Sequence, residues 1–243
     1  MNRIAAALAP LLAWTSTALA EEFTVNPDAG NNGFAAVFDD ALKELNIAVS
    51  SAVECSFTYD EVTGAVSGRC AVPLATVRVD NNSTKTRHFR EWITNNKSDP
   101  EACRFEAVFN GVKVGPLPLD TPVPFSAEVA ITVCGRGRAD GGREKVTGTA
   151  RLLPPSIYAG RKTVRLRAVI AVFHREAYRI GPQFTEGWPA RLQSLADVVA
   201  EAGAIEFCLF AEAREPSLPA VAISPSPETQ SPPAATKEWE GTR

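Results

Sequence analysis

Apolar and polar residues alternate along most of the chain, as they do in strands that have one buried face. In the segment 162–172, for example, Val164 and Leu166 lie on one face and Arg165 lies on the other. We predict eight strands from this pattern, at 33–38, 53–60, 67–80, 102–111, 126–135, 143–153, 162–172 and 204–213.

The segments between these strands have the composition of hairpin connections. The sequence EVTG at 61–64 and the sequence RADGGRE at 138–144 are typical of turns, and the second contains an Asp-Gly pair suited to positive φ. A proline-rich loop at 116–124 separates two further strands. Eight antiparallel strands with one apolar face each predict an all-β domain, either a closed barrel or a sandwich.

A helical period interrupts the alternation at 185–204. Apolar residues recur there at i, i+4, i+7 and i+11, Pro189 suits the first turn, and Gly203 suits the C-terminal cap. We interpret this segment as a helix that covers the barrel core, in preference to a helix that binds a membrane or a partner. Its apolar face is formed by Trp188, Leu192, Leu195 and Val199.

The segment TKTRHFREWITNN at 84–96 predicts a second helix. Phe89, Trp92 and Ile93 form one apolar patch, and Thr86 is a suitable N-cap. Arg87 and Glu91 are spaced for an i, i+4 ion pair on the wetter side. We expect the patch to dock the helix on the barrel and close one end of it, with His88 at the rim or in solvent.

The two ends of the chain differ from the middle. Residues 1–20 have one cation, an apolar run and small residues before a possible cleavage site, which predicts an export signal. The segment 214–243 is rich in proline and serine and has no periodicity, which predicts a disordered tail. The barrel domain is therefore expected at 21–213.

The charge of the chain and its hydropathy limit its partners. Residues 1–20 contain Arg3 and no acid, so their removal changes the formal charge from −3 to −4. A mildly acidic protein lacks the basic surface that nucleic acids and anionic membranes attract. No other segment is long and apolar enough to span a bilayer.

Five cysteines in an exported protein predict disulfides with one thiol left over. Cys55 and Cys70 flank a predicted turn on the apolar faces of neighbouring strands, where a disulfide is plausible. Cys103 and Cys134 lie at the far ends of the next hairpin, but the alternation places them on opposite faces, so that pair requires a bulge. Cys208 is the expected free thiol.

Motifs for catalysis and metal binding are missing from the sequence. There is no Gly-x-Ser-x-Gly, no Cys-x-x-Cys and no paired-histidine spacing, and the two histidines, His88 and His174, are far apart. We therefore expect no catalytic residue, no metal site and no cofactor. A hydrolase-type enzyme that uses His88 or His174 is the weakest alternative.

Small residues on the predicted inward faces bear on whether the barrel is hollow. Gly148, Ala150 and Ala168 leave space that could form a cavity for a small apolar ligand. A filled core is an equally good interpretation of the residues alone.

Several segments in order resemble the YceI-like family of exported proteins. They are a helical stretch TKTRHFREWI after an outer strand, the strand CRFEAVF, the long hairpin AEVAITVCGRGRADGGREKVTGTARL, the turn HREAYRIGPQF and the closing strand AIEFCLFAEA. The similarity covers about residues 34–213.

The resemblance implies an eight-stranded antiparallel, lipocalin-like barrel with two short accessory helices. It also implies a periplasmic or secreted protein without catalytic activity that holds a polyisoprenoid or fatty-chain lipid, and a homodimer is possible. The alternative is a cell-envelope interaction module with a filled barrel. We expect the ligand to contact inward-facing residues, namely Val53, Phe57, Val72, Leu74, Phe105, Phe109, Val129, Ile131, Leu166 and Ile170.

Overall fold

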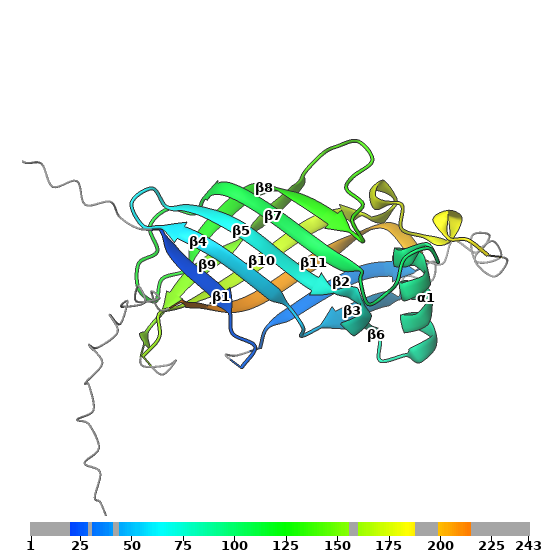
Figure 1. The fold of residues 1–243 in the computed structure, drawn as a ribbon, viewed down its shortest axis with the longest axis horizontal. Coiled ribbons are helices and arrows are strands. Elements are labelled where there is room, and N and C mark those ends of the chain that lie inside the picture. The colour runs from blue at the N-terminus through cyan, green and yellow to red at the C-terminus, as the bar shows by residue number, and fades with distance from the viewer. Residues whose placement is uncertain (1–19, 29–30, 41–43, 156–159, 188–198, 215–243) are drawn as a thin grey trace, which may run out of the picture.

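The alternating segments form one antiparallel sheet that closes on itself (Figure 1). The structure is a computed structural model that describes residues 20–28, 31–40, 44–155, 160–187 and 199–214. Its strands are β1 (Glu21–Val25), β2 (Gly33–Asp40), β3 (Leu45–Ser50), β4 (Glu54–Asp60), β5 (Ala65–Pro73), β6 (Arg78–Val79), β7 (Arg104–Lys113), β8 (Val123–Val133), β9 (Glu144–Leu153), β10 (Thr163–His174) and β11 (Val199–Ala213).

The eleven strand segments occupy eight positions around the barrel. β1 pairs with 211–213 of β11 and β2 pairs with 199 and 203–208, so β1 and β2 follow each other along one edge of β11. In the same way β3 continues into β4, and β5 continues into β6. The pairing of β1 with β11 closes the ring. The predicted eight-stranded barrel is therefore confirmed, and the sandwich alternative is excluded.

The strand β1 was not predicted. Two other differences from the predicted strands have local causes. The predicted strand 67–80 is broken after Pro73 by a turn of 3-10 helix, η1 (Leu74–Thr76), before β6 begins. β3 was not predicted because its alternation is inverted: Ile47 and Val49 are exposed, whereas Ala48 and Ser50 face inward.

The predicted helix near residue 90 is confirmed as α1 (Ser83–Thr94), but it begins earlier than expected. The side chain of Asn82 is the N-cap and accepts hydrogen bonds from the backbone N–H groups of Thr84 and Lys85. Thr86 lies inside the helix, where its hydroxyl accepts from the backbone N–H of Val79 at 3.0 Å. A stronger cap four residues upstream therefore starts the helix.

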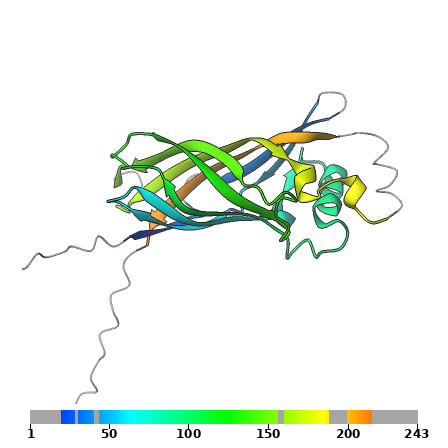
Figure 2. The ribbon, with the colours of Figure 1, turned by 90° about the horizontal axis from the view of Figure 1, so that it is seen from above.

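The predicted helix at 185–204 is wrong in its last part. Val199 and Gly203 belong to β11 and pair with Asp40 and Phe38 of β2, so sheet pairing overrides the helical period there. Residues 188–198 lie outside the described residues. Two 3-10 helices, η3 (Arg175–Tyr178) and η4 (Pro182–Phe184), accompany α1 at the same end of the barrel (Figure 2).

The structure confirms the predicted Cys55–Cys70 disulfide and contains a second one, Cys103–Cys134, for which the sequence required a bulge. Cys55 and Cys70 lie directly opposite each other on β4 and β5. Cys103 and Cys134 are also bonded, but without the expected bulge. Cys134 follows the last residue of β8 with a left-handed φ of 48°, and this turn redirects its side chain toward Cys103. Cys208 is the free cysteine.

The predicted export signal and the predicted tail lie outside the described residues, apart from Ala20 and Arg214. Among the described helices, none has the length and apolar character needed to cross a bilayer.

Candidate ligand cavity

Two apolar chambers lie along the inside of the barrel. The chamber nearer to β1, called the inner chamber, has a volume of about 100 Å³. It is lined from β4, β5, β7, β8, β9, β10 and β11 and has no charged lining residue. Tyr59 lines it, and the Tyr59 hydroxyl donates to the Gly115 carbonyl and accepts from the Leu117 N–H. The inner chamber can therefore bind only apolar groups.

The second chamber, called the outer chamber, lies under α1 and has a volume of about 320 Å³. One face of α1 lines it with residues spaced as i, i+3, i+4, i+7 and i+8, namely Lys85, His88, Phe89, Trp92 and Ile93. The expectation that α1 docks through Phe89 and Trp92 and covers one end of the barrel is confirmed.

Five polar or charged residues line the outer chamber. They are Asp40, Asn46, Lys85, His88 and Arg175. Arg175 is held in place, since its guanidinium donates to the carbonyl oxygens of Ala200, Ile180 and Val199. The outer chamber is thus apolar with a polar rim, the arrangement that suits an amphiphile.

The lysine at this rim is paired with an acid outside the chamber. Lys85 Nζ lies 2.6 Å from Asp80 Oδ2, and this hydrogen bond raises the pKa of Lys85. Burial raises the pKa of Asp80, but the bonds from Lys85 and from the Ile47 N–H outweigh burial, so that its pKa lies below the usual range. Lys85 is therefore a firm cation at neutral pH.

Eight of the ten residues predicted to contact a ligand line one of the chambers. Leu74 and Phe105 line the outer chamber. Six residues line the inner chamber, namely Phe57, Phe109, Val129, Ile131, Leu166 and Ile170. Because a residue that lines a chamber need not contact a ligand, the role of these eight residues in binding stays a prediction.

The two remaining residues, Val53 and Val72, are buried but line neither chamber. On β5, Cys70 lines the inner chamber and Leu74, just beyond the strand, lines the outer chamber. Val72 lies between them, opposite Phe105, and is therefore at the level that separates the chambers.

The small inward residues do not all create space. A Cβ atom added to Gly148 would lie 2.8 Å from Cζ of Phe125 and would also overlap the Arg167 carbonyl oxygen. The Phe125 ring therefore fills the place of the missing side chain, as aromatic residues do opposite glycine in sheets. Ala150 and Ala168 do line the inner chamber.

Sequence reasoning missed several chamber residues, among them Phe34, Phe173, Ile205 and Phe207. Phe34, Ile205 and Phe207 lie in segments that were predicted as strands. Their positions in the register place them on the inward face, so the signal was available. Phe173 lies one residue beyond its predicted strand and after a register shift, which alternation cannot show.

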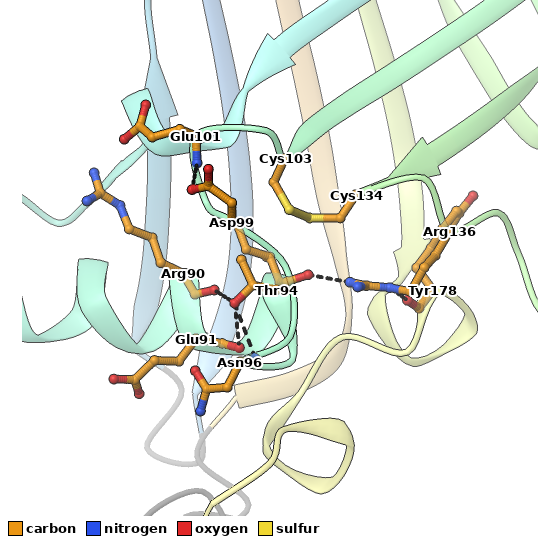
Figure 3. The surroundings of a disulfide bond; sticks show 11 residues. Arg90, Glu91, Thr94, Asn96, Asp99, Glu101, Cys103, Cys134, Arg136 and Tyr178 are labelled. Carbon is orange, nitrogen blue, oxygen red and sulfur yellow. Dashed lines mark hydrogen bonds between the residues drawn. A yellow bond between two sulfur atoms is a disulfide. The ribbon is translucent and has the colours of Figure 1, made fainter.

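Side-chain bonds attach α1 to the rest of this end of the barrel (Figure 3). Arg136, in the turn after β8, donates to the Ile93 carbonyl of α1 and to the Tyr178 carbonyl of η3. The Cys103–Cys134 disulfide joins that same turn to the chain that follows α1. These two connections hold α1 and η3 together above the outer chamber.

A buried polar cluster supports η3 from below. The Tyr178 hydroxyl donates to Glu144 Oε1 at 2.8 Å, and Arg138 Nη1 donates to the same oxygen at 2.9 Å. Burial, reinforced by the bond to Glu144, raises the pKa of Tyr178 well above its usual range. Tyr178 is therefore neutral at any physiological pH and acts as a hydrogen-bond donor.

Neither histidine belongs to a cluster with metal-binding geometry. His88 is half-buried at the outer chamber, and His174 is exposed at the start of η3. Among the described residues, no group of three or more His, Cys, Asp or Glu side chains could hold a metal ion.

The fold and its cavity define a class, a closed antiparallel barrel with an apolar interior. No family model matches the sequence, and no curated protein matches it. Among solved structures, the chain is similar to a polyisoprenoid-binding domain from Saccharophagus degradans implicated in plant cell wall breakdown, with a TM-score of 0.53 and 13% identity. The match covers 81% of this chain and 100% of that domain, and at this identity it shows the fold alone.

Proposed function

We propose that this protein binds a long-chain apolar ligand, a polyisoprenoid or a fatty-chain lipid, inside its barrel, and that it is a diverged relative of the YceI-like family. One observation carries the proposal: the described residues enclose two largely apolar chambers, and the charged side chains that line them belong to the outer chamber. The similar structure of a polyisoprenoid-binding domain supports it.

Burial of the ligand chain supplies the binding energy in this proposal. Each methylene moved from water to an apolar wall contributes about 0.8 kcal/mol. The chain lies in the outer chamber, and its polar end stays at the rim near Lys85 and His88. Lys85 has three donors, of which one goes to Asp80, so it can also donate to an oxygen of the ligand.

The proposed role is carriage or sequestration in an oxidising compartment, the periplasm or the cell exterior. Two disulfides in the barrel are compatible with that location. The proposal includes no catalysis, and the polar residues of the outer chamber are assigned to holding the polar end of the ligand.

The test uses two alanines that are neighbours on β2 and point in opposite directions. Ala36 is buried and lines the outer chamber, whereas Ala35 lies on the outer face opposite Glu206. We expect Ala36→Phe to fill the chamber and abolish uptake of a fluorescent fatty-chain probe. Ala35→Phe adds the same ring outside the barrel and should leave uptake unchanged.

Native mass spectrometry of the purified full chain provides an independent readout. A long-chain species should co-purify with the wild-type protein and with Ala35→Phe, and it should be lost from Ala36→Phe. A clean apo mass, together with no uptake of an added polyprenyl or fatty-chain probe, would contradict the proposal.

One observation favours a second candidate function, a cell-envelope interaction module. The outer face of β3 exposes three apolar side chains in a row, Leu45, Ile47 and Val49. Such a stripe is typical of a surface that contacts another molecule. This candidate would replace the first if the barrel takes up no chain.

A further inference from the structure

We propose that three phenylalanine rings form a partition between the two chambers and set the length of chain that the barrel accepts. The partition consists of Phe34 on β2, Phe105 on β7 and Phe207 on β11. This inference rests on the proposed function, and it goes further by assigning chain-length selection to named residues.

The three rings are in mutual contact. Their centroids are 5.6 Å apart for Phe34 and Phe105, 5.3 Å for Phe34 and Phe207, and 5.8 Å for Phe105 and Phe207. These separations are within the range of favourable aromatic pairs. The rings therefore form one compact aromatic layer.

The topology shows that this layer crosses the barrel. Phe34 and Phe207 are opposite each other on the neighbouring strands β2 and β11. β7, which carries Phe105, is four positions away from β11 in either direction around the ring of eight. Phe105 therefore meets the other two rings from the opposite wall. An eight-stranded barrel is narrow enough that three rings in mutual contact can close it at one level.

The position of the layer along the barrel axis coincides with the boundary between the chambers. On β7, Phe105 lines the outer chamber and Ala107 lines the inner chamber. On β11, Ile205 lines the outer chamber and Phe207 lines the inner chamber. A chain that enters below the polar rim thus reaches the rings after it has filled the outer chamber.

Each chamber has a length comparable to that of a fatty chain, so the boundary can limit the chain length that is bound. The walls of the inner chamber run from Val164 to Ile170 on β10, and those of the outer chamber run from Val199 to Ile205 on β11. Six residues of tilted strand correspond to roughly 15 Å along the barrel axis. A series of saturated fatty acids from octanoate to eicosanoate covers chains shorter than one chamber and chains that need both.

The variant Phe207→Ala removes one ring of the partition. Phe207 is the best position because it is half-buried against the inner chamber, whereas Phe105 also packs on Phe173. In the wild type, we expect affinity to rise about fourfold for each added methylene and then to level off where the chain reaches the rings. In Phe207→Ala the rise should continue to longer chains.

Phe210→Ala is the matched control. Phe210 lies three residues further along β11 and outside the chambers, and its ring contacts Arg165. This control loses a ring from the same strand. Its affinity should stop rising at the same chain length as that of the wild type. If Phe207→Ala does not fold, Phe207→Leu replaces it, with a smaller shift of the plateau to longer chains.

A double variant tests whether the added chain length enters the inner chamber. Ala127 lines that chamber from β8, so Ala127→Phe reduces its free volume. We expect Ala127→Phe to cancel the gain of Phe207→Ala for long chains. An undiminished gain would contradict the assignment.

The two proposals fail in different ways. Suppose that the wild type binds the acids and that its affinity stops rising at the same chain length as that of Phe207→Ala and Phe207→Leu. The partition is then overturned and the binding function stands. If the wild type binds no acid of the series and no polyprenyl probe, the binding function fails, and the partition has no role in selection.

Discussion

The two ends of the barrel are closed in different ways. At the β1 end, Phe23 is fully buried and its ring stacks on Phe57 with a centroid distance of 5.3 Å, and the Tyr59 hydroxyl holds the loop after β7. At the opposite end, α1 covers the outer chamber with half-buried Phe89 and Trp92.

Charges strengthen the contrast between the ends. Lys162 pairs with Glu21 and Glu61 at the β1 end and joins three separate segments. The α1 end has its polar groups around the chamber. The β1 end is thus held by stacked rings and ion pairs beside a pocket of about 230 Å³ that has charged residues in its wall, and the other end is covered by a helix over a largely apolar chamber. We infer that changes at the β1 end reduce stability and that changes at the α1 end act chiefly on ligand exchange.

The largest expected effect is on stability at the β1 end. Phe23→Ala removes a fully buried aromatic ring and should lower the free energy of unfolding by about 3–5 kcal/mol. Phe89→Ala at the α1 end should cost less, because the Phe89 side chain is half-buried. Urea denaturation measures both variants, and equal losses would contradict the contrast.

Removal of each disulfide in turn provides a second comparison. Removing Cys103–Cys134 as C103A/C134A should cost about 3–4 kcal/mol and should speed ligand dissociation, because this bond holds the chain that follows α1. Removing Cys55–Cys70, which closes a shorter loop, should cost about 3 kcal/mol and speed dissociation less. Stopped-flow displacement of a fluorescent fatty-chain probe measures the rates. Equal acceleration in both variants would show that the cover does not control exchange.

A smaller effect on stability is expected from the buried polar cluster that supports η3. Tyr178→Phe removes the hydroxyl that donates to buried Glu144, and Arg138 remains as the other donor. The loss should be about 1–3 kcal/mol, the cost of a buried acceptor that loses a partner. Thermal unfolding measures it, and Tyr59→Phe at the β1 end, which also loses a hydroxyl with two bonds, is the comparison.

The smallest effect concerns the ion pair beside the rim. Because the pKa of Asp80 is lowered by folding, its contribution to stability is present above the unfolded value of 3.8 and is lost as pH falls through the folded pKa. Asp80→Asn should therefore cost up to about 1 kcal/mol at pH 7, and this difference should shrink below pH 3.8. Denaturant titrations at both pH values check it. A difference that does not change with pH would contradict a contribution from the ionised Asp80 carboxylate.

The sequence by itself determined the inward faces of most of the strands, although β1 and β3 were not predicted. Alternation identifies the buried face of a strand without knowledge of its partners, and a short turn defines the partner of the next strand. These local rules were sufficient for the Cys55–Cys70 disulfide and for the inward direction of Phe105 and Ile131.

The same local rules failed where a stronger tertiary interaction competes. Residues 199–204 continue the predicted helical segment but belong to β11, where Val199, Gly203 and Ala204 pair with β2 across a register shift. Cys134 breaks the alternation because the chain turns there in a left-handed conformation. Asn82 replaces Thr86 as the helix cap because it offers its side chain to two N–H groups at once.

Only the tertiary structure decided which inward side chains line a chamber. Val72 and Leu166 have the same inward pattern in the sequence, yet Val72 lies at the level of the partition and Leu166 lines the inner chamber. Contact between Phe105 and Phe207 joins strands on opposite sides of the ring. Period-two alternation carries the direction of a side chain but not its height along the axis, which depends on the tilt and stagger of all eight strands together.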